Sequence, residues 1–148
     1  DVYHHHQLTT PRTIFGHGIH LADSEINTLV ETSSVIAHCP TANSFLRSGT
    51  MPRSRWIDAK LRLSIGSDIG AGYERSMVRV ARSMIEAASQ LSNRFPSAAE
   101  AWYAITTGNA DAVGFQDVGR LAWGMQADIV VVSPDIDWLN HRIDPLSM

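Results

Sequence analysis

The sequence is poor in cysteine and lysine, and both shortages narrow the class of protein. Cys39 is the single cysteine, which excludes an internal disulfide and is typical of a reducing compartment such as the cytoplasm. Lys60 is the only lysine, and the formal net charge of the 148 residues is −3. Because no basic stripe or polybasic tract occurs, we expect neither a nucleic acid nor a membrane surface as a partner.

Long apolar runs are also lacking. No stretch approaches the ~20 residues that a bilayer-spanning helix needs. The opening letters, DVYHHHQLTT, contain no apolar segment of a signal peptide, and they contain no starting methionine. We therefore expect a cytoplasmic chain, either processed or a fragment of a longer protein, with enough residues for one core.

Three short apolar runs, each ending in a polar side chain, are the main feature that is present. They lie at residues 12–17, 34–38 and 61–68, and they end in His17, His38 and Asp68. A helical pattern follows each run. This alternation predicts an α/β fold, with a parallel sheet covered by helices. Three such units are too few for a closed eight-stranded barrel, which needs ~200 residues or more, so the sheet is either small and open or part of a barrel.

Apolar spacing and cap residues place the helices. Asp23 and Ser24 offer a cap for the first helix, and Ser97 with Glu100 has the pattern of a capping box. The polar stretch of residues 41–52 predicts a loop. The expected helices cover residues 24–30, 53–60, 77–91, 97–107 and 109–113. Beyond them we expect a turn-rich hairpin at residues 119–124, a strand at 127–132 and an irregular tail.

The polar ends of the three predicted strands are the candidate site. A single histidine at a strand end is more often structural, and Asp68 alone reads as a turn or cap residue. Three neighbouring strands that end this way bring the side chains to one edge of a parallel sheet. Histidine and aspartate together suit zinc or iron, and a metal lowers the pKa of bound water to about 7.

Four segments, taken in order, resemble a known family. They are IFGHGIHL, VIAHCPTANSFLRSG, LSIGSDIGAGYERSM and GRLAWGMQADIVVVSP. Together they are similar to the C-terminal part of the amidohydrolase superfamily, nearest to its guanine deaminase branch. The resemblance implies the last three βα units of a (β/α)8 TIM-type barrel (strands 6–8) over residues 1–118. It implies part of a small composite β-sandwich and a tail over residues 119–148.

The resemblance also implies roles for individual residues. His17 would orient a metal-bound hydroxide and the substrate, and Asp68 would bind the metal and handle the hydroxide proton. His38 and Asn43 would shape the substrate pocket. The complete enzyme would carry one divalent metal, zinc or iron, act on a small-molecule purine as a homodimer, and convert guanine to xanthine and ammonia.

The chain departs from the family pattern in its missing ligands. The family needs a His-x-His pair after the first barrel strand, and a histidine followed three residues later by a glutamate after the fifth. The run His4-His5-His6 lacks that spacing and reads as a solvated loop. The chain thus holds one metal ligand of four, and we expect it to be inactive in isolation.

Other interpretations stay open. One is a different purine, pterin or triazine aminohydrolase or a chlorohydrolase; another is a non-catalytic barrel fragment that binds or oligomerises. A cysteine hydrolase is a more distant alternative, because Cys39 and its neighbour His38 would point to opposite faces of a strand.

Several further residues receive structural interpretations. We expect His20 to be hydrogen-bonded or solvated, and Glu74 and Arg75 to be surface charges at a helix start. Because GSDIGAG does not match G-x-G-x-x-G, a dinucleotide site is unsupported. The four tryptophans share no spacing and are expected to pack in the core; they are Trp56, Trp102, Trp123 and Trp138.

Overall fold

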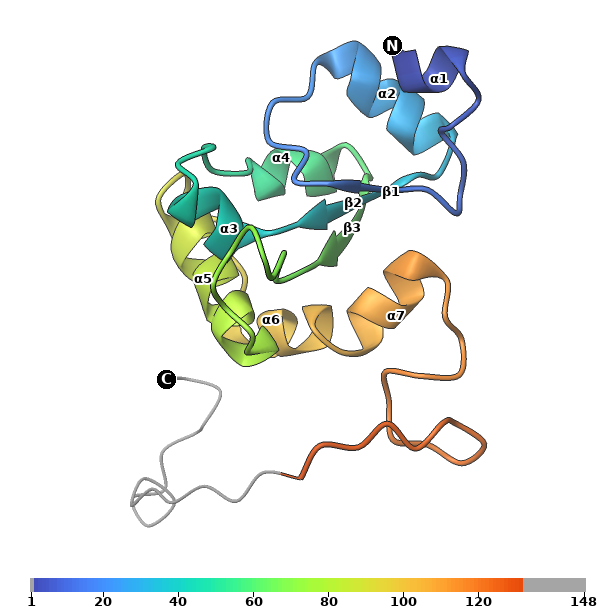
Figure 1. The fold of residues 1–148 in the computed structure, drawn as a ribbon, viewed down its shortest axis with the longest axis vertical. Helices are drawn as coiled ribbons and strands as arrows, with labels where there is room; N and C mark the ends of the chain where they lie inside the picture. Colours follow the sequence, from blue (N-terminus) through green and yellow to red (C-terminus); the bar gives the residue numbers. More distant parts are fainter. Residues whose placement is uncertain (1, 132–148) are drawn as a thin grey trace.

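A computed structural model describes residues 2–131 of the chain. Ten helices and strands follow one another in this part (Figure 1). The strands are β1 (Ile14–Gly16), β2 (Val35–His38) and β3 (Arg62–Ile65). The helices are α1 (Val2–His5), α2 (Asp23–Glu31), α3 (Pro40–Phe45), α4 (Arg53–Asp58), α5 (Met77–Ser89), α6 (Ala98–Ala104) and α7 (Thr107–Val113). None of the helices within residues 2–131 is long and apolar enough to cross a membrane.

The three strands form one parallel sheet in the order β1-β2-β3. In its register Phe15 lies beside Ile36, which lies beside Leu63. The predicted parallel sheet and its three strands are therefore confirmed. Because strand order follows chain order, the carboxyl ends of all three strands meet at one edge of the sheet.

One face of the sheet packs against α2 and α4. Fully or nearly fully buried side chains from both helices and from β2 form this core, and Phe15 and Leu63 pack against it. Trp56 of α4 is completely buried, and its indole Nε1–H donates to the carbonyl of Gly18 at 2.9 Å. The buried core residues are Ile26, Leu29, Ile36, Met51, Trp56 and Leu61.

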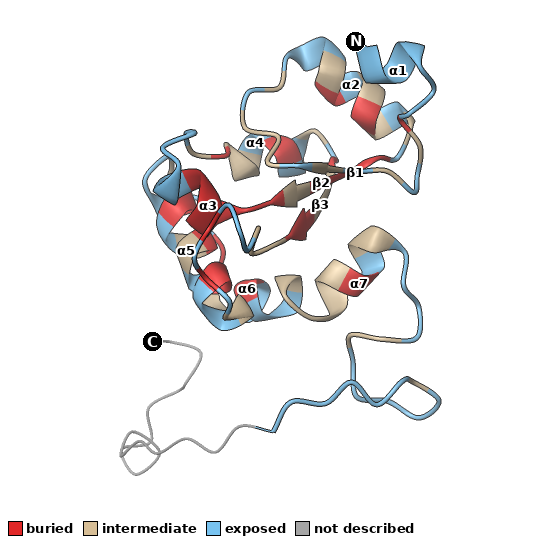
Figure 2. Cartoon of the chain, viewed as in Figure 1, coloured by how far each residue is buried: buried red, intermediate tan, exposed pale blue. Residues whose placement is uncertain are grey.

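A second core joins α5 and α6 to the end of β3. Val80 and Met84 of α5 contact Ile65 and Ala101 there, and Figure 2 shows the buried residues gathered on the strands and the inner sides of the helices. Ser76 caps α5 through its side chain. The predicted capping box of α6 forms, because the Ser97 N–H donates to Glu100 and the Glu100 N–H donates to Ser97.

Helix α7 is attached to β3 by two side chains, because Nη2 of Arg62 donates to the carbonyl of Ala112 at 2.7 Å and Asn109 pairs with the backbone of Ile65. The N–H of Ile65 donates to Oδ1 of Asn109 at 2.8 Å, and Nδ2 of Asn109 donates to the carbonyl of Ile65 at 2.9 Å. The helix ends at Gly114, whose φ of +86° is the left-handed conformation that glycine adopts easily. The predicted stop at Gly114 is confirmed.

Three local predictions near the first two strands are wrong. The expected loop at residues 41–52 begins as helix α3, because Pro40 occupies the first helical position, where its missing N–H costs nothing. The N-cap of α2 is Ala22 rather than Asp23 or Ser24; the backbone N–H of Ala22 donates to Glu25 instead. The histidine run lies partly in α1, where His4 is hydrogen-bonded to Thr9.

The predicted hairpin at residues 119–124 does not form, and neither does the strand over the described part of residues 127–132. Within residues 2–131 this segment has no β partner, and Val130 and Val131 are exposed. A strand is stable only when a neighbour takes up its backbone hydrogen bonds. Val132 and the predicted irregular tail lie outside the described residues.

The packing role expected for the tryptophans is confirmed for Trp56 only. Trp102 is half-exposed and Trp123 is fully exposed, at 49% and 104%. Trp138 lies outside the described residues. The spacing of tryptophans in the sequence does not distinguish one that packs in the core from one that lies on the surface.

We predict that the chain self-associates when it is produced alone. β1 is an edge strand, and Ile14 on it is 50% exposed, a combination that favours pairing with another chain. Light scattering during size exclusion should give a mass that rises with concentration above the 16.3 kDa of one chain. Ile14→Lys should reduce this rise, whereas Ile57→Lys on α4 should not. A monodisperse monomer at all concentrations would contradict the prediction.

Candidate active site

The carboxyl edge of the sheet brings together the side chains that the sequence singled out. His17 follows β1 directly, His38 is the last residue of β2, and Asp68 comes three residues after β3. Nε2 of His17 and Oδ2 of Asp68 lie 3.7 Å apart. This separation is too long for a hydrogen bond and too short for the two groups to be independent.

Both members of this pair have an unusual backbone conformation. His17 has a φ of +68° and Asp68 a φ of +52°, a region that residues other than glycine rarely adopt. Each turn is closed by a short hydrogen bond: Gly18 N–H to Gly16 C=O at 2.9 Å, and Gly72 N–H to Asp68 C=O at 2.7 Å. Four other non-glycine residues within residues 2–131 share this conformation away from the pair, so what distinguishes His17 and Asp68 is that their side chains also face each other.

The glycine after Asp68 is needed for space. A Cβ atom on Gly72 would lie 3.0 Å from the Cβ of Ala42 in α3, which is tighter than nine in ten real Cβ contacts. Gly70 has a φ of +112°. The sharp turn and close approach predicted for these glycines are confirmed, and they press the Asp68 loop against α3.

Asn43 of α3 contacts the other ring nitrogen of His17. Its Oδ1 lies 2.7 Å from Nδ1 of His17, across 26 residues of sequence. The Asn43 side chain is buried, and its Nδ2 has no hydrogen-bond partner among the described residues. An unsatisfied buried donor costs about 1–3 kcal/mol, so this amide is oriented at the expense of stability.

His38 is buried and electrically neutral. Burial is the main cause that lowers its pKa from the ordinary 6.5 to about 3, and electrostatic repulsion from Arg53, and from His17 where acid protonates both rings, adds to the effect. Its Nδ1 has no hydrogen-bond partner within residues 2–131. A neutral, packed imidazole next to the pair fits a wall of the site rather than a proton carrier.

The carboxylate of Asp68 could serve as one ligand of a cation whose other ligands come from further residues. Its Oδ2 is buried and lacks a hydrogen-bond partner among residues 2–131. A buried carboxylate oxygen is stabilised by a cation or a hydrogen-bond donor, and within residues 2–131 it faces Nε2 of His17 at 3.7 Å, which is outside hydrogen-bond distance. In the described part of the chain no group of three or more histidine, cysteine, aspartate or glutamate side chains is arranged for a metal.

Cys39 does not behave as a nucleophile. The thiol is buried, and burial together with the negative charge of Asp68 raises its pKa. Its Sγ donates weakly to the carbonyl of Ala37 at 3.5 Å. Because the thiolate is the reactive form, the cysteine-hydrolase interpretation finds no support.

Of the three residues that were expected to have structural or surface roles, two match the expectation and one does not. His20 is hydrogen-bonded as expected, with its Nε2 2.9 Å from the carbonyl of Ser48. Glu74 is not a surface charge: it is 8% exposed, accepts the N–H of Ser76 at 2.8 Å, and lies 3.8 Å from Arg79. Arg75 is exposed, as predicted. The contacts of Glu74 with Ser76 and Arg79 are local, whereas the contact of Asn43 with His17 depends on tertiary structure, and no local pattern in the sequence indicates it.

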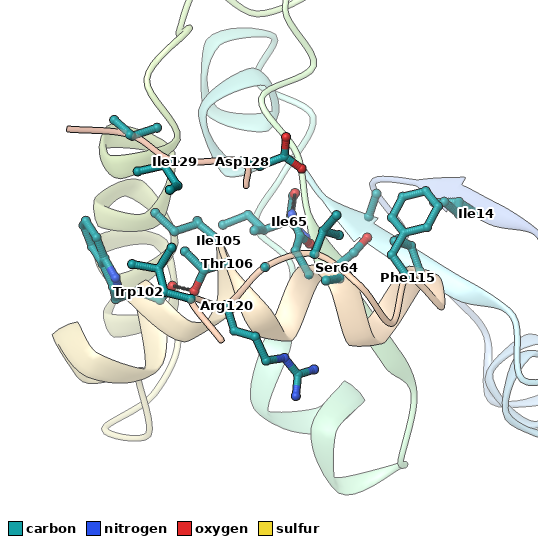
Figure 3. A pocket seen from close by; sticks show the side chains of 18 residues that line it. Ile14, Ser64, Ile65, Trp102, Ile105, Thr106, Phe115, Arg120, Asp128 and Ile129 are labelled. Carbon is teal, nitrogen blue, oxygen red and sulfur yellow. Dashed lines mark hydrogen bonds between the residues drawn. The ribbon is translucent and has the colours of Figure 1, made fainter. Parts of the chain in front are cut away.

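A larger cavity than the space around these residues lies elsewhere in the described chain. It has a volume of about 640 Å³ and runs between the strands, α6, α7 and the following segment (Figure 3). Ser64, Ile65, Trp102 and Arg120 line it, whereas His17, His38, Asn43 and Asp68 do not. We give the polar cluster more weight than this cavity, because the cluster combines strained backbone, unsatisfied buried atoms and paired titratable groups.

Comparison with known proteins identifies the protein family to which the chain belongs. The model of the amidohydrolase family matches residues 1–146, so the chain belongs to this family. The guanine deaminase of Escherichia coli is 38% identical over 135 residues, which are 90% of this chain and 30% of that protein. The chain thus spans about a third of the length of its curated relatives.

Solved structures agree with this assignment. E. coli guanine deaminase superposes with a TM-score of 0.90 at 34% identity, over 99% of this chain and 36% of that one. An adenosine deaminase from Xanthomonas campestris with bound zinc gives 0.73 at 32% identity, over 82% and 29%. Guanine deaminase from C. acetobutylicum, with guanine in its active site, gives 0.65 at 33%, over 72% and 26%. The chain therefore has an amidohydrolase fold, in which a small parallel sheet and its helices match part of an α/β barrel.

We predict that His38 makes the stability of the chain depend on acidity. Its pKa is lowered by folding, so the unfolded state binds more protons than the folded state between pH 6.5 and about 3. The free energy of unfolding should therefore fall as the pH falls through this window, by about 1.4 kcal/mol per pH unit for this group.

Urea unfolding at a series of pH values measures this slope. His38→Gln should remove the histidine contribution, while the carboxylates that also titrate in this range remain the same in both proteins. Equal slopes for the chain and the variant would contradict the prediction.

Proposed function

We propose that this chain is the C-terminal part of a metal-dependent hydrolytic deaminase that converts guanine to xanthine and ammonia. The observation that carries the proposal is the pair His17 and Asp68, held 3.7 Å apart on strained turns at the carboxyl edge of a parallel sheet. The carboxyl edge is where α/β barrels place their reacting groups. The similarity to two guanine deaminases and to a zinc-containing adenosine deaminase supports the same reaction class.

In this proposal β1, β2 and β3 are strands 6, 7 and 8 of the barrel, within a domain of residues 1–118. Residues 119–148 contribute to the small β-sandwich. Val130 and Val131, in the segment that follows α7, support this division, because such exposed β-branched side chains would be covered in a sandwich. The complete enzyme is a cytoplasmic homodimer in this proposal.

Asp68 is the residue that would hold the metal, zinc or iron, together with histidines outside this chain. A bound metal supplies Lewis-acid activation of water, whose pKa falls to about 7. The buried, unpartnered Oδ2 supports this role. Hydrolytic deamination also needs a proton for a poor leaving group, and in this proposal the Asp68 carboxylate would accept one from the nucleophile.

His17 would orient the nucleophile and the substrate through Nε2. That nitrogen is directed toward Asp68, and the side chain is 43% exposed, so it is accessible from the open edge of the sheet. His38 and Asn43 would form the wall of the substrate pocket. Their burial and the neutral state of His38 support a role in shape rather than in proton transfer.

A second candidate is a deaminase of another purine or of a related heterocycle. The likeness to an adenosine deaminase at 32% identity favours this alternative over unrelated reactions. A chlorohydrolase would release chloride in place of ammonia. If the protein releases neither ammonia nor chloride, the interpretation as a non-catalytic module is favoured.

We predict that the isolated chain binds metal weakly. Asp68 is its one proposed ligand, and a stable zinc shell takes four. Elemental analysis after dialysis without chelator should give far less than one metal ion per chain. Near-stoichiometric metal would contradict this account of the missing ligands.

We predict that Asp68→Asn abolishes deamination by the complete enzyme. Loss of a ligand and proton acceptor should lower kcat by at least ~10²–10⁴-fold, measured as ammonia release from guanine. Asp117→Asn, at an exposed position after α7, is the matched control and should leave the rate unchanged. Activity of the unsubstituted enzyme on adenosine alone would favour the second candidate.

A further inference from the structure

We infer that Asn43 is a positioning residue that fixes the neutral tautomer of His17. Its amide oxygen, 2.7 Å from Nδ1 of His17, accepts the ring N–H and leaves Nε2 as the bare nitrogen that faces Asp68. The meaning for catalysis rests on the proposed function. The tautomer itself is a property of this chain and is measured without metal or substrate.

The amide of Asn43 is held in place from several directions. Its backbone N–H donates to the carbonyl of Cys39 at 2.9 Å, and its own carbonyl accepts the N–H of Ser48 at 2.9 Å. The side chain is 2% exposed, inside a helix that starts at the buried Pro40. The backbone of Asn43 therefore has a fixed position, from which the buried side chain places Oδ1 against the ring of His17.

The ring of His17 is equally constrained at its backbone. The N–H of His17 donates to the carbonyl of Ala37 at 2.8 Å, which extends the ladder of the sheet. The next residue, Gly18, accepts the indole N–H of Trp56 and leaves no room for a side chain, because a Cβ there would lie 2.6 Å from Ile36. Neither partner of the His17–Asn43 contact is free to move away from the other.

The direction of the hydrogen bond follows from the chemistry of the two groups. A neutral imidazole carries one N–H, on either nitrogen, and an amide oxygen only accepts. Oxygen next to Nδ1 therefore requires the Nδ1–H tautomer, although isolated histidine side chains favour Nε2–H. The bare Nε2 and the Asp68 carboxylate then form two acceptors 3.7 Å apart, an arrangement that orients a donor such as a water molecule between them.

Nitrogen-15 NMR of histidine reads the tautomer directly. The chain is labelled at its histidine rings and studied in the neutral range of the imidazole, in solution or by magic-angle spinning if it associates. His17→Gln assigns the signal. We expect a protonated Nδ1 and an unprotonated Nε2 for His17 in the unsubstituted chain.

Three variants separate this role from simple packing. Asn43→Asp keeps an acceptor and should retain the Nδ1–H signal, whereas Asn43→Ala removes the acceptor and should shift His17 to Nε2–H. Thr41→Val on the same helix removes another buried oxygen without a partner, and it should leave the tautomer unchanged. If Asn43→Ala does not fold, the His17 tautomer measured in the unsubstituted chain and in Asn43→Asp still tests the inference.

An Nε2–H signal in the unsubstituted chain would overturn the inference, because it would mean that the amide presents its NH₂ group to the ring. An unchanged tautomer in folded Asn43→Ala would overturn it as well. Neither result bears on whether the complete enzyme releases ammonia from guanine. Absence of deamination with an Nδ1–H tautomer would reject the proposed function and leave the inference intact.

Discussion

The hydrogen bonds of the parallel ladder continue past the strands themselves, and the candidate site depends on this continuation. The N–H of His17 donates to Ala37, and the N–H of Gly66 donates to His38, each one residue beyond the assigned end of its strand. These two bonds fix the backbone from which the turns carrying His17 and Asp68 start. With them, two residues in an unfavourable left-handed conformation are kept within 3.7 Å of each other.

This arrangement leaves several buried polar atoms without a hydrogen-bond partner, which costs stability. His38 Nδ1, Thr41 Oγ1, Asn43 Nδ2 and Asp68 Oδ2 are buried and unsatisfied, and they are the side-chain atoms of this kind found within residues 2–131. All four residues lie on β2, on α3 or on the loop after β3. The concentration of unsatisfied polar atoms in one region is typical of a site built for a ligand rather than for stability.

Much of this could be predicted from the sequence, for reasons that differ among the elements. The three strands and α5 are confirmed because apolar period and burial coincide in them, and His17, His38 and Asp68 were found because polar side chains close those strands. Helix α3 was missed because its core-facing residues, Thr41 and Asn43, are polar. The contact of Asn43 with His17 joins segments 26 residues apart, and no local pattern encodes such a contact.

The strand expected at residues 127–132 shows the limit of local propensity. Its run of β-branched residues favours extended structure, yet the described part has no neighbour to pair with. Helix–sheet packing in the first hundred residues is self-contained enough to form its own cores. The last described segment has no such core, and most of its residues are exposed.

The amide of Asn109 makes the two edges of the sheet unequal. Both backbone groups of Ile65 that would receive another strand are already occupied by this side chain, while the outer edge of β1 has no comparable cover among residues 2–131. A strand placed beside β3 cannot hydrogen-bond to Ile65 unless the Asn109 side chain moves away. The two edges of the sheet therefore differ at the backbone level: the one at β3 carries a side-chain block next to the active edge, and the one at β1 does not within residues 2–131.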